Sequence, residues 1–392
     1  MRIMLANFTK MVNDSGGLAK VTSNFANEMN RRGHSVAVVY SDDNVGDFFY
    51  PLDKGIEAYD LRHMDGKSID FPFWLKVKRE IMRPVNIRSA RTVNNEFAEH
   101  YLLENIRKVY DKVKPDVIVA FQTAATKLLV CDLNINVPVV SMSHGDPEDY
   151  FHTYAPNELP ALSRCAMCQV LLPSFEQHLK THVPEAKTIT IGNVVPQYED
   201  LANLAAEKQT YRIIQVGRMV RNHKRPHLLI KAFALIARDF PEWTVEIWGA
   251  EDKKVYTKHL KGLIKSSGLE KQVFLKGTTS DVPSKLREAD IFAFPSAYEG
   301  FPLAMTEAMS IGLPVVGFNN CAAVNELVRD GENGILCEDG VESFAKALSR
   351  LMKNKEIRIR FGRQAHEDMK AYSPDVIWQR WEELMKNLLE GK

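Results

Sequence analysis

One stretch, residues 291–317, constrains the fold of this chain more than any other, because it reads as strand, turn, helix and strand in order. An apolar run at residues 291–294 ends at a proline and is typical of a buried parallel strand. Pro302 begins the following helix, where a residue without an N–H group costs nothing. The helix ends near Gly312, and residues 313–316 form the next strand. This alternation predicts an α/β fold with a parallel sheet.

Two acidic residues flank the turn of this stretch. Glu299 lies on the loop at the carboxyl end of the first strand, and Glu307 lies within the helix. In open α/β sheets, ligands bind at the carboxyl ends of strands, and phosphates bind at helix N-termini. Carboxylates accept hydrogen bonds from sugar hydroxyls, so the pair suits a nucleotide-sugar. A helix-stabilising acid and a surface glutamate are the alternative, which the spacing alone leaves open. The predicted phosphate-binding turn consists of Gly300, Phe301, Pro302 and Leu303.

The sequence PSAYEGFPLAMTEAMSIGLPVVG, residues 295–317, resembles the Glu-x7-Glu signature of retaining glycosyltransferases of family 4. Residues 325–336 are similar to that family's "E-hydrophobic-x-DG-x-NG-hydrophobic" segment. The resemblance implies the GT-B fold, in which two Rossmann-like β/α/β domains face each other across a cleft. It also implies a C-terminal helix that crosses back to the N-terminal domain.

The length of 392 residues predicts two domains, because it exceeds what one core usually supports. The polar segment 197–209 interrupts the alternation of strands and helices and indicates the boundary. We therefore expect one domain at residues 1–195, joined by the terminal helix 375–392, and a second at 196–374. The resemblance implies that the first domain binds the acceptor and the second binds the nucleotide-sugar donor.

Composition excludes several classes of protein. Apolar residues make up 45% of the chain and charged residues 26%, which rules out gross disorder. A net charge of +1 implies no chain-wide attraction to nucleic acid, which we do not expect as a partner. No run of eighteen apolar residues predicts a membrane span. Five cysteines and no signal peptide favour a reducing compartment, so a cytoplasmic location is expected.

No metal site and no cofactor are predicted. The pair Cys165 and Cys168 lacks the second pair of cysteines or histidines that zinc requires, and predicts two buried thiols at a helix start. The acids at residues 146–149 lack the Asp-x-Asp spacing of metal-dependent glycosyltransferases and are interpreted as acceptor-loop or surface acids.

The N-terminal half contains a second candidate region. A strand at residues 2–6 leads to Gly16 and Gly17 and then to a helix, an arrangement that exposes amides to an anion. The complete Gly-x-Gly-x-x-Gly fingerprint of a dehydrogenase is absent. His144 follows a strand at residues 138–142, where a packing role is equally consistent with the sequence. The resemblance implies that the glycine loop lines the cleft beside donor phosphate and acceptor, with His144 near the donor sugar.

A basic turn follows the first strand of the second half. The strand at residues 211–216 ends at Gly217 and Arg218, and Lys224 follows before a helix. Arginine and lysine on such a connection can clamp a diphosphate, although a solvated basic loop is the alternative. The segment resembles the family's "GR…K" motif, with one extra residue before the lysine and Arg225 in place of the usual glycine. We predict Lys224 as the phosphate lysine, with Arg225 as a stand-in.

The resemblance implies retaining, metal-independent transfer of a hexose or N-acetylhexosamine from a nucleotide-sugar, expected to be UDP-linked. The acceptor would be a hydroxyl of a glycan or lipid-linked molecule in polysaccharide or glycan biosynthesis. No carboxylate nucleophile is evident, which favours same-face attack with the leaving phosphate accepting the proton. A sugar-nucleotide epimerase of the same fold and an inactive donor-binding partner subunit are the alternatives. The predicted catalytic residues are Glu299, His144, Arg218 and Lys224. The predicted donor-binding residues are Gly16, Gly17, Gly217, Thr278, Gly300, Phe301, Pro302, Leu303 and Glu307.

Residues 74–91 form the most basic local stretch, with aromatic and aliphatic residues between the charges. Such a segment can lie on anionic lipid headgroups. We therefore expect peripheral contact with the inner face of the cytoplasmic membrane and favour a lipid-linked acceptor. A solvated helix face and a soluble sugar acceptor are the alternatives.

Overall fold

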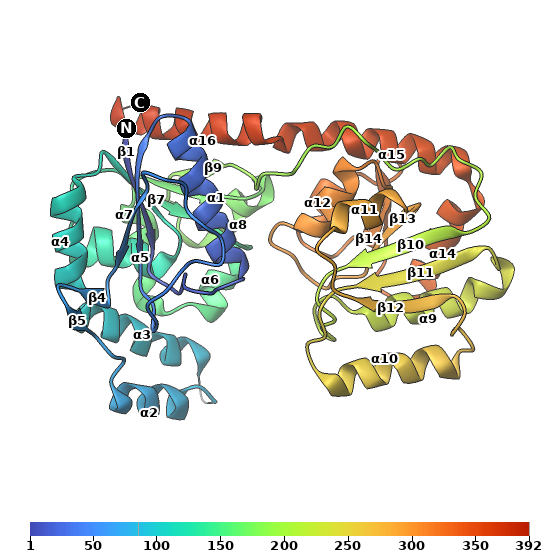
Figure 1. Ribbon diagram of the computed structural model, residues 1–392, viewed down its shortest axis with the longest axis horizontal. Helices are drawn as coiled ribbons and strands as arrows, with labels where there is room; N and C mark the ends of the chain where they lie inside the picture. Colours follow the sequence, from blue (N-terminus) through green and yellow to red (C-terminus); the bar gives the residue numbers. More distant parts are fainter. Residues whose placement is uncertain (85, 392) are drawn as a thin grey trace. The chain divides into compact units, whose positions relative to one another are not determined.

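The computed structural model describes residues 1–84 and 86–391 (Figure 1). It divides into two compact units, one formed by Met1–Gly192 and Trp378–Lys392 and the other by Asn193–Ile377. Each unit is built on a parallel sheet connected through helices, so the predicted α/β fold with two Rossmann-like domains is confirmed. The predicted ranges 74–91 and 375–392 include Val85 and Lys392, which lie outside the described residues.

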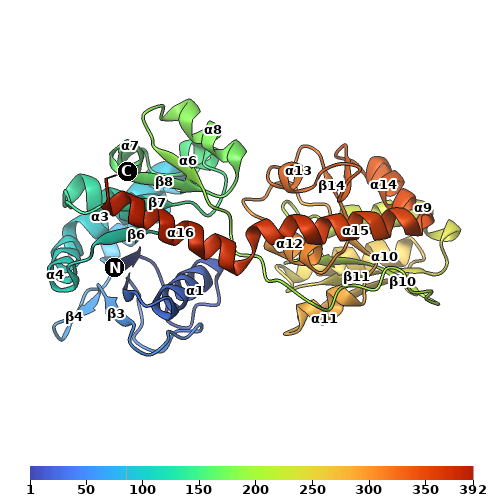
Figure 2. The ribbon, with the colours of Figure 1, turned by 90° about the horizontal axis from the view of Figure 1, so that it is seen from above.

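The first unit contains a seven-stranded parallel sheet in the order β3-β2-β1-β6-β7-β8-β9. Figure 2 shows the successive strands β6, β7 and β8 of this sheet from above. Its strands are β1 (Arg2–Asn7), β2 (Ser35–Tyr40), β3 (Glu57–Asp60), β6 (Val117–Ala120), β7 (Val139–Met142), β8 (Met167–Val170) and β9 (Thr188–Thr190), with a separate hairpin of β4 (His63–Met64) and β5 (Lys67–Ser68). Its helices are α1 (Gly17–Arg31), α2 (Phe73–Met82), α3 (Ile87–Tyr101), α4 (Leu103–Val113), α5 (Thr123–Lys127), η1 (Leu128–Asp132), α6 (Glu148–Thr153), η2 (Pro156–Glu158), α7 (Pro160–Arg164) and α8 (Pro173–His182).

The second unit contains a six-stranded parallel sheet in the order β12-β11-β10-β13-β14-β15. Its strands are β10 (Tyr211–Val216), β11 (Trp243–Trp248), β12 (Val273–Gly277), β13 (Ile291–Phe294), β14 (Val315–Phe318) and β15 (Gly334–Cys337). Its helices are α9 (Pro226–Ile236), η3 (Ala237–Asp239), α10 (Lys254–Ser266), α11 (Val282–Arg287), α12 (Leu303–Ser310), α13 (Val324–Leu327), α14 (Val341–Lys353), α15 (Lys355–Met369) and η4 (Lys370–Tyr372), and α16 (Pro374–Leu389) follows.

The strands next to each sheet's centre are apolar along almost their whole length, because helices pack on a parallel sheet from both sides. In β1, every residue after the first is buried, and all four residues of β13 are buried. Each sheet also has one point where the strand order reverses, between β1 and β6 in the first unit and between β10 and β13 in the second. Loops separate at such a point, and ligands of open α/β sheets bind there.

The C-terminal half of α16 packs on the first unit, as predicted. Trp378 and Trp381 contact Phe25 of α1 edge-on, with ring centroids 5.3 Å and 5.0 Å apart. Glu382 accepts hydrogen bonds from Arg32 at 2.9 Å and pairs with His34 at 2.8 Å. The terminal helix therefore contributes both aromatic burial and ion pairs to a unit whose other residues all precede Asn193.

At three places the structure differs from the local sequence pattern. Residues 170–174 have the pattern of a single apolar strand, but β8 ends at Val170 and Pro173 begins α8, where proline suits the first turn. Cys165 and Cys168 are buried as predicted, but Cys165 follows α7 and Cys168 lies in β8 rather than at a helix start. Residues 101–113 have the pattern of one helix, but α3 ends at Tyr101 and the separate helix α4 begins at Leu103.

Candidate nucleotide-sugar site

The centre of the candidate site is an ion pair at the switch point of the second sheet. Lys224 lies on the loop after β10 and Glu299 on the loop after β13, and Lys224 Nζ is 2.5 Å from Glu299 Oε1. The ammonium also lies 5.0 Å from the ring centroid of Phe294. His223 Nε2 is 3.4 Å from the same carboxylate oxygen, and its ring stacks on Tyr298 at 4.4 Å. Two adjacent strands therefore bring cationic and anionic groups together where a ligand is expected.

Glu299 is held in its ionised form. Its side chain is 8% exposed, and this burial by itself would raise its pKa. The hydrogen bond from His223 and the charge of Lys224 act in the opposite direction and outweigh burial, so the pKa of Glu299 lies below its usual range. The site thus holds a negative carboxylate beside a positive ammonium at neutral pH.

Arg225 fixes the loop on which Lys224 lies. Its backbone is left-handed, with φ 45° and ψ 46°, a conformation that suits the glycine usual at this place in the motif. Its guanidinium donates to the carbonyl oxygens of Pro295 at 2.8 Å and Ser296 at 3.0 Å, and pairs with Asp339 at 2.8 Å. Arg225, which stands where the family motif usually has glycine, therefore joins the loop after β10 to the loop after β13.

The loops after β10, β11 and β12 hold one another closely. Gly217 N donates to Trp248 O, and Gly249 N donates to Gly277 O. A Cβ atom on Gly249 would lie 1.9 Å from Gly217 O, so only glycine fits there. A Cβ on Gly217 would lie 3.5 Å from the Lys224 side chain. Of the other predicted residues, Arg218 follows Gly217 and Thr278 follows β12, and both are exposed.

Helix α12 adds a second group of contacts. Pro302 precedes it, and its carbonyl accepts from Met305 N at 2.9 Å and Thr306 N at 3.0 Å. The amides of Leu303 and Ala304 come before any carbonyl of the helix that could accept from them, so they suit an anion. Of the other turn residues, Phe301 is buried against Tyr372, with ring centroids 5.3 Å apart, and Gly300 is half-buried.

Sequence analysis missed Tyr198, which holds Glu307. The Tyr198 hydroxyl donates to Glu307 Oε1 at 2.6 Å. Burial and this hydrogen bond to a carboxylate raise the pKa of Tyr198, so the phenol stays protonated and donates. Tyr198 belongs to the polar segment before β10, and no motif surrounds it. Only the path of that segment along α12 brings it to Glu307.

The predicted residues of the first unit lie at the carboxyl edge of its own sheet. Gly16 precedes α1, and its amide donates to Asp14 Oδ1 at 2.8 Å, while Gly17 is exposed. His144 follows β7, is exposed, and stacks on Phe121 with ring centroids 5.8 Å apart. Both places adjoin the switch point between β1 and β6.

A buried polar network at this edge was also missed. Asn7, the last residue of β1, is fully buried, and its Nδ2 donates to Thr22 Oγ1 at 2.9 Å. Its Oδ1 accepts from Gln122 Nε2 at 2.5 Å and from Thr9 Oγ1 at 2.7 Å. An asparagine that ends an apolar strand was the available signal. The network ties the loop after β1 to the loop after β6.

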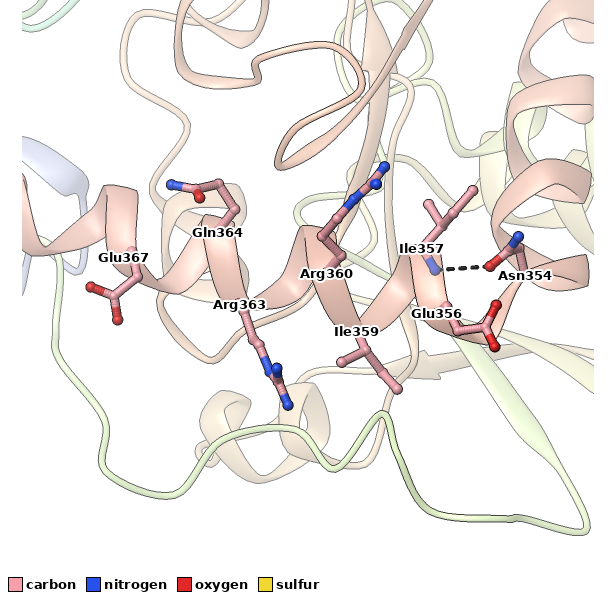
Figure 3. A pocket seen from close by; sticks show the side chains of 8 residues that line it. All are labelled: Asn354, Glu356, Ile357, Ile359, Arg360, Arg363, Gln364 and Glu367. Carbon is pink, nitrogen blue, oxygen red and sulfur yellow. Dashed lines mark hydrogen bonds between the residues drawn. The ribbon is translucent and has the colours of Figure 1, made fainter.

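A hollow of about 660 Å³ lies elsewhere in the second unit, along one face of α15 (Figure 3). It shares no residue with the Lys224–Glu299 site. In the described part of the chain, no group of three or more histidine, cysteine, aspartate or glutamate side chains is arranged to hold a metal ion. The residues lining the hollow are Asn354, Glu356, Ile357, Ile359, Arg360, Arg363, Gln364 and Glu367.

Comparison with known proteins covers the unit that contains this site. The family described as "Glycosyl transferases group 1" matches residues 197–368, a span that includes Lys224, Glu299 and Glu307. Residues 197–368 are therefore a group 1 glycosyltransferase domain. The two parallel-sheet units match GT-B structures in fold.

Individual relatives differ in how much of the chain they share. An uncharacterised glycosyltransferase of Haemophilus influenzae is 24% identical over 96% of this chain and 98% of its own length. The UDP-Gal:alpha-D-GlcNAc-diphosphoundecaprenol alpha-1,3-galactosyltransferase of Escherichia coli is 39% identical over 23% of this chain and 24% of its own. The chain spans only 23% and 28% of two longer curated relatives.

Among solved structures, Staphylococcus aureus TarM, in a complex that contains UDP, has a TM-score of 0.73 to this chain at 16% identity. The match covers 98% of this chain and 100% of TarM. This likeness establishes the fold of the whole described chain, whereas the family match is confined to the group 1 domain.

Proposed function

We propose that this glycosyltransferase belongs to family 4 and moves a hexose or N-acetylhexosamine from a UDP-sugar, with retention and without a metal. The acceptor is a hydroxyl of a glycan or lipid-linked molecule in polysaccharide or glycan biosynthesis. The observation that carries the proposal is the Lys224–Glu299 pair at the β10–β13 switch point, next to the N-terminus of α12. The five free cysteines favour a reducing, cytoplasmic location.

Departure of a nucleoside diphosphate requires positive groups around its phosphate oxygens. Lys224, Arg218 and the first amides of α12 are assigned this role, because preorganised donors stabilise developing charge without rearranging. Glu299 pairs with the Lys224 ammonium. A bound diphosphate would take over part of that pairing, and the ammonium would already be in position.

The two glutamates are assigned to sugar hydroxyls. Glu307 would accept from the ribose hydroxyls with the carboxylate oxygen that Tyr198 leaves available. Glu299 would accept from a hydroxyl of the transferred sugar. Its pairing with Lys224 and His223 disfavours a role as nucleophile, because those contacts lower the basicity of the carboxylate.

Retention without an enzyme nucleophile follows from attack on the face that the diphosphate leaves. The bond from the sugar anomeric carbon to the phosphate oxygen breaks, and the acceptor oxygen bonds to the same carbon. The acceptor proton passes to the departing phosphate, so the reaction needs no general base from the protein. We assign the acceptor to the first unit, at the edge that holds Gly16, Gly17 and His144.

Similar proteins support the donor and acceptor classes. The TarM complex contains UDP together with a GlcNAc-glycerol compound. The Escherichia coli relative is named for a UDP-linked donor and a diphosphoundecaprenol acceptor.

A ligand panel tests the proposal. UDP should raise the Tm of the protein, because a hundredfold excess of ligand over Kd adds about 2.7 kcal/mol to the free energy of unfolding. GDP and ADP should raise the Tm much less. EDTA should leave the shift unchanged. The Glu307→Gln variant should lose most of it, whereas Glu367→Gln on α15 should retain it. A shift that needs a divalent metal would contradict metal-independent binding, and the lack of a shift with any nucleotide would contradict the nucleotide-sugar donor.

The anomeric configuration of the product, measured by NMR, decides between retention and inversion.

A further inference from the structure

Helix α2 presents an unusual face to solvent. Four of its large apolar side chains are exposed: Phe73 by 80%, Trp74 by 54%, Val77 by 41% and Ile81 by 66%. At 100° per residue, these four positions fall within one stripe about 100° wide. Soluble surfaces carry single exposed apolar residues, but a contiguous stripe marks an interaction site.

The opposite face of α2 anchors the helix to its own unit. Leu75 is fully buried, and the Arg79 guanidinium lies 5.2 Å from the ring centroid of Phe71. Arg79 also donates to Asn94 of α3 at 3.3 Å. Figure 1 shows α2 at the rim of the first unit, beyond α3. These contacts hold α2 with its apolar stripe facing solvent.

Basic side chains border the stripe. Lys76 and Arg83 lie along one edge and Lys78 along the other, as the helical periodicity requires. Lys76 and Arg83 are exposed, and Lys78 pairs with Glu96 at 2.6 Å. Glu80, on the Lys76 edge, lies 3.5 Å from Arg83.

Only part of the basic stretch 74–91 borders the apolar stripe of α2. Arg88 Nε donates to Tyr154 O at 3.0 Å, and the Arg91 guanidinium lies 4.7 Å from the Tyr154 ring centroid. These two arginines hold the segment after α6 and do not border the stripe. The interaction face is therefore confined to α2 and its C-cap, Arg83.

We propose that this face of α2 docks on the surface of an anionic lipid bilayer, with Phe73, Trp74, Val77 and Ile81 at the level of the headgroups. An amphipathic helix with an apolar stripe and basic edges lies in the bilayer interface in this way. A second copy of the chain is the less favourable occupant, because three of the four charged side chains that border the stripe are cationic: Lys76, Lys78 and Arg83, against Glu80. Binding requires no sugar transfer, so its test is independent of the proposed reaction.

Vesicle binding tests the proposal directly. The full chain should sediment with vesicles of phosphatidylcholine and phosphatidylglycerol, and much less with phosphatidylcholine alone. Ile81→Asp should lower the partition coefficient by about tenfold or more, because it places a charge in the apolar stripe. Lys76→Gln should lower it about fivefold on anionic vesicles and hardly at all on neutral ones. The matched control is Val255→Asp on α10, which changes an 82% exposed valine in the second unit and should bind as the wild type does.

Tryptophan fluorescence locates the contact. Trp74 is exposed, Trp248 in β11 of the second unit is half-buried, and Trp243, Trp378 and Trp381 are buried. Brominated lipids should quench the wild type, and Trp74→Phe should abolish most of that quenching while retaining sedimentation. Equal binding of Ile81→Asp and wild type, or quenching that persists without Trp74, would overturn the proposal. So would a wild-type dimer in lipid-free buffer that Ile81→Asp converts to monomer, since a second copy would then cover the face.

Discussion

Lys224 and Glu299 depend on each other at the residue scale, since both side chains are largely buried. Replacing Lys224 with methionine should lower the free energy of unfolding by about 3 kcal/mol, because the Glu299 carboxylate loses its main counter-charge. The double variant Lys224→Met/Glu299→Gln should recover most of that loss, since neither side chain is then charged. Both variants should lose about 10²-fold or more in kcat. Urea unfolding and steady-state kinetics measure the two effects. Equal stability of the single and double variants would contradict the coupling.

Glu299 also predicts a dependence of stability on pH. Its pKa is lowered in the folded protein from an ordinary value of 4.5, so its contribution is complete above about that pH. The contribution is lost as the pH falls through the lower folded value, because the folded protein then takes up the proton it had resisted. The difference in Tm between wild type and Glu299→Gln should therefore be constant from pH 7 to pH 5 and change as the pH falls below 4.5. A difference that stays constant down to pH 3 would contradict it.

Tyr198 acts on the proposed ribose site through Glu307. Tyr198→Phe should raise KM for the UDP-sugar by about tenfold with little change in kcat, since one neutral-to-charged hydrogen bond is worth about 1.5 kcal/mol. Tyr256→Phe is the matched control, because it removes a buried phenol that hydrogen-bonds His227 at 2.8 Å in the same unit. A change in kcat alone, or the same KM in both variants, would argue against a positioning role.

At the scale of elements, the loop after β11 packs tightly against the loop after β10 at Gly249. Gly249→Ala places a Cβ at 1.9 Å from Gly217 O and at φ 148°, so the loop that holds Arg218 must move. The variant should lose several kcal/mol of stability and much of its UDP-induced shift. Gly262→Ala in α10 meets no atom within 4 Å and should stabilise the protein by about 0.5–1 kcal/mol. Thermal unfolding of both variants, with and without UDP, separates local strain from a general effect of adding a methyl group.

At the scale of the whole molecule, the C-terminal helix links the last residues of the chain to the stability of the first unit. Trp381 is 1% exposed, and Trp381→Ala should cost about 3–5 kcal/mol through loss of burial and the remaining cavity. Calorimetry should show this loss in the transition that UDP does not shift, because UDP is expected to stabilise the second unit. Leu389→Ala, which changes a 42% exposed residue of the same helix, should have little effect. A loss confined to the UDP-sensitive transition would contradict the packing on α1.

Sequence patterns predicted the strands β1, β7, β10, β13 and β14, because parallel strands buried on both faces are continuous apolar runs. Such patterns fail where one apolar run crosses two elements, as at residues 170–174, since hydrophobicity does not mark the end of a strand. In the basic stretch 74–91, the sequence does not show which basic side chains face solvent. Periodicity places Lys76 on α2 correctly, but only packing reveals that Arg88 and Arg91 turn toward Tyr154.

The sequence by itself determined the α/β class, the two parallel sheets, the positions of Lys224 and Glu299 on loops and the position of Glu307 within a helix, because these follow from local periodicity and turn chemistry. The tertiary structure decided which of these groups meet. Lys224 and Glu299 are 75 residues apart in sequence and become an ion pair only because β10 and β13 are neighbours in the sheet. Tyr198 and Glu307, 109 residues apart, meet through the path of an irregular segment. Contacts of this range depend on strand order and packing, which no local pattern encodes.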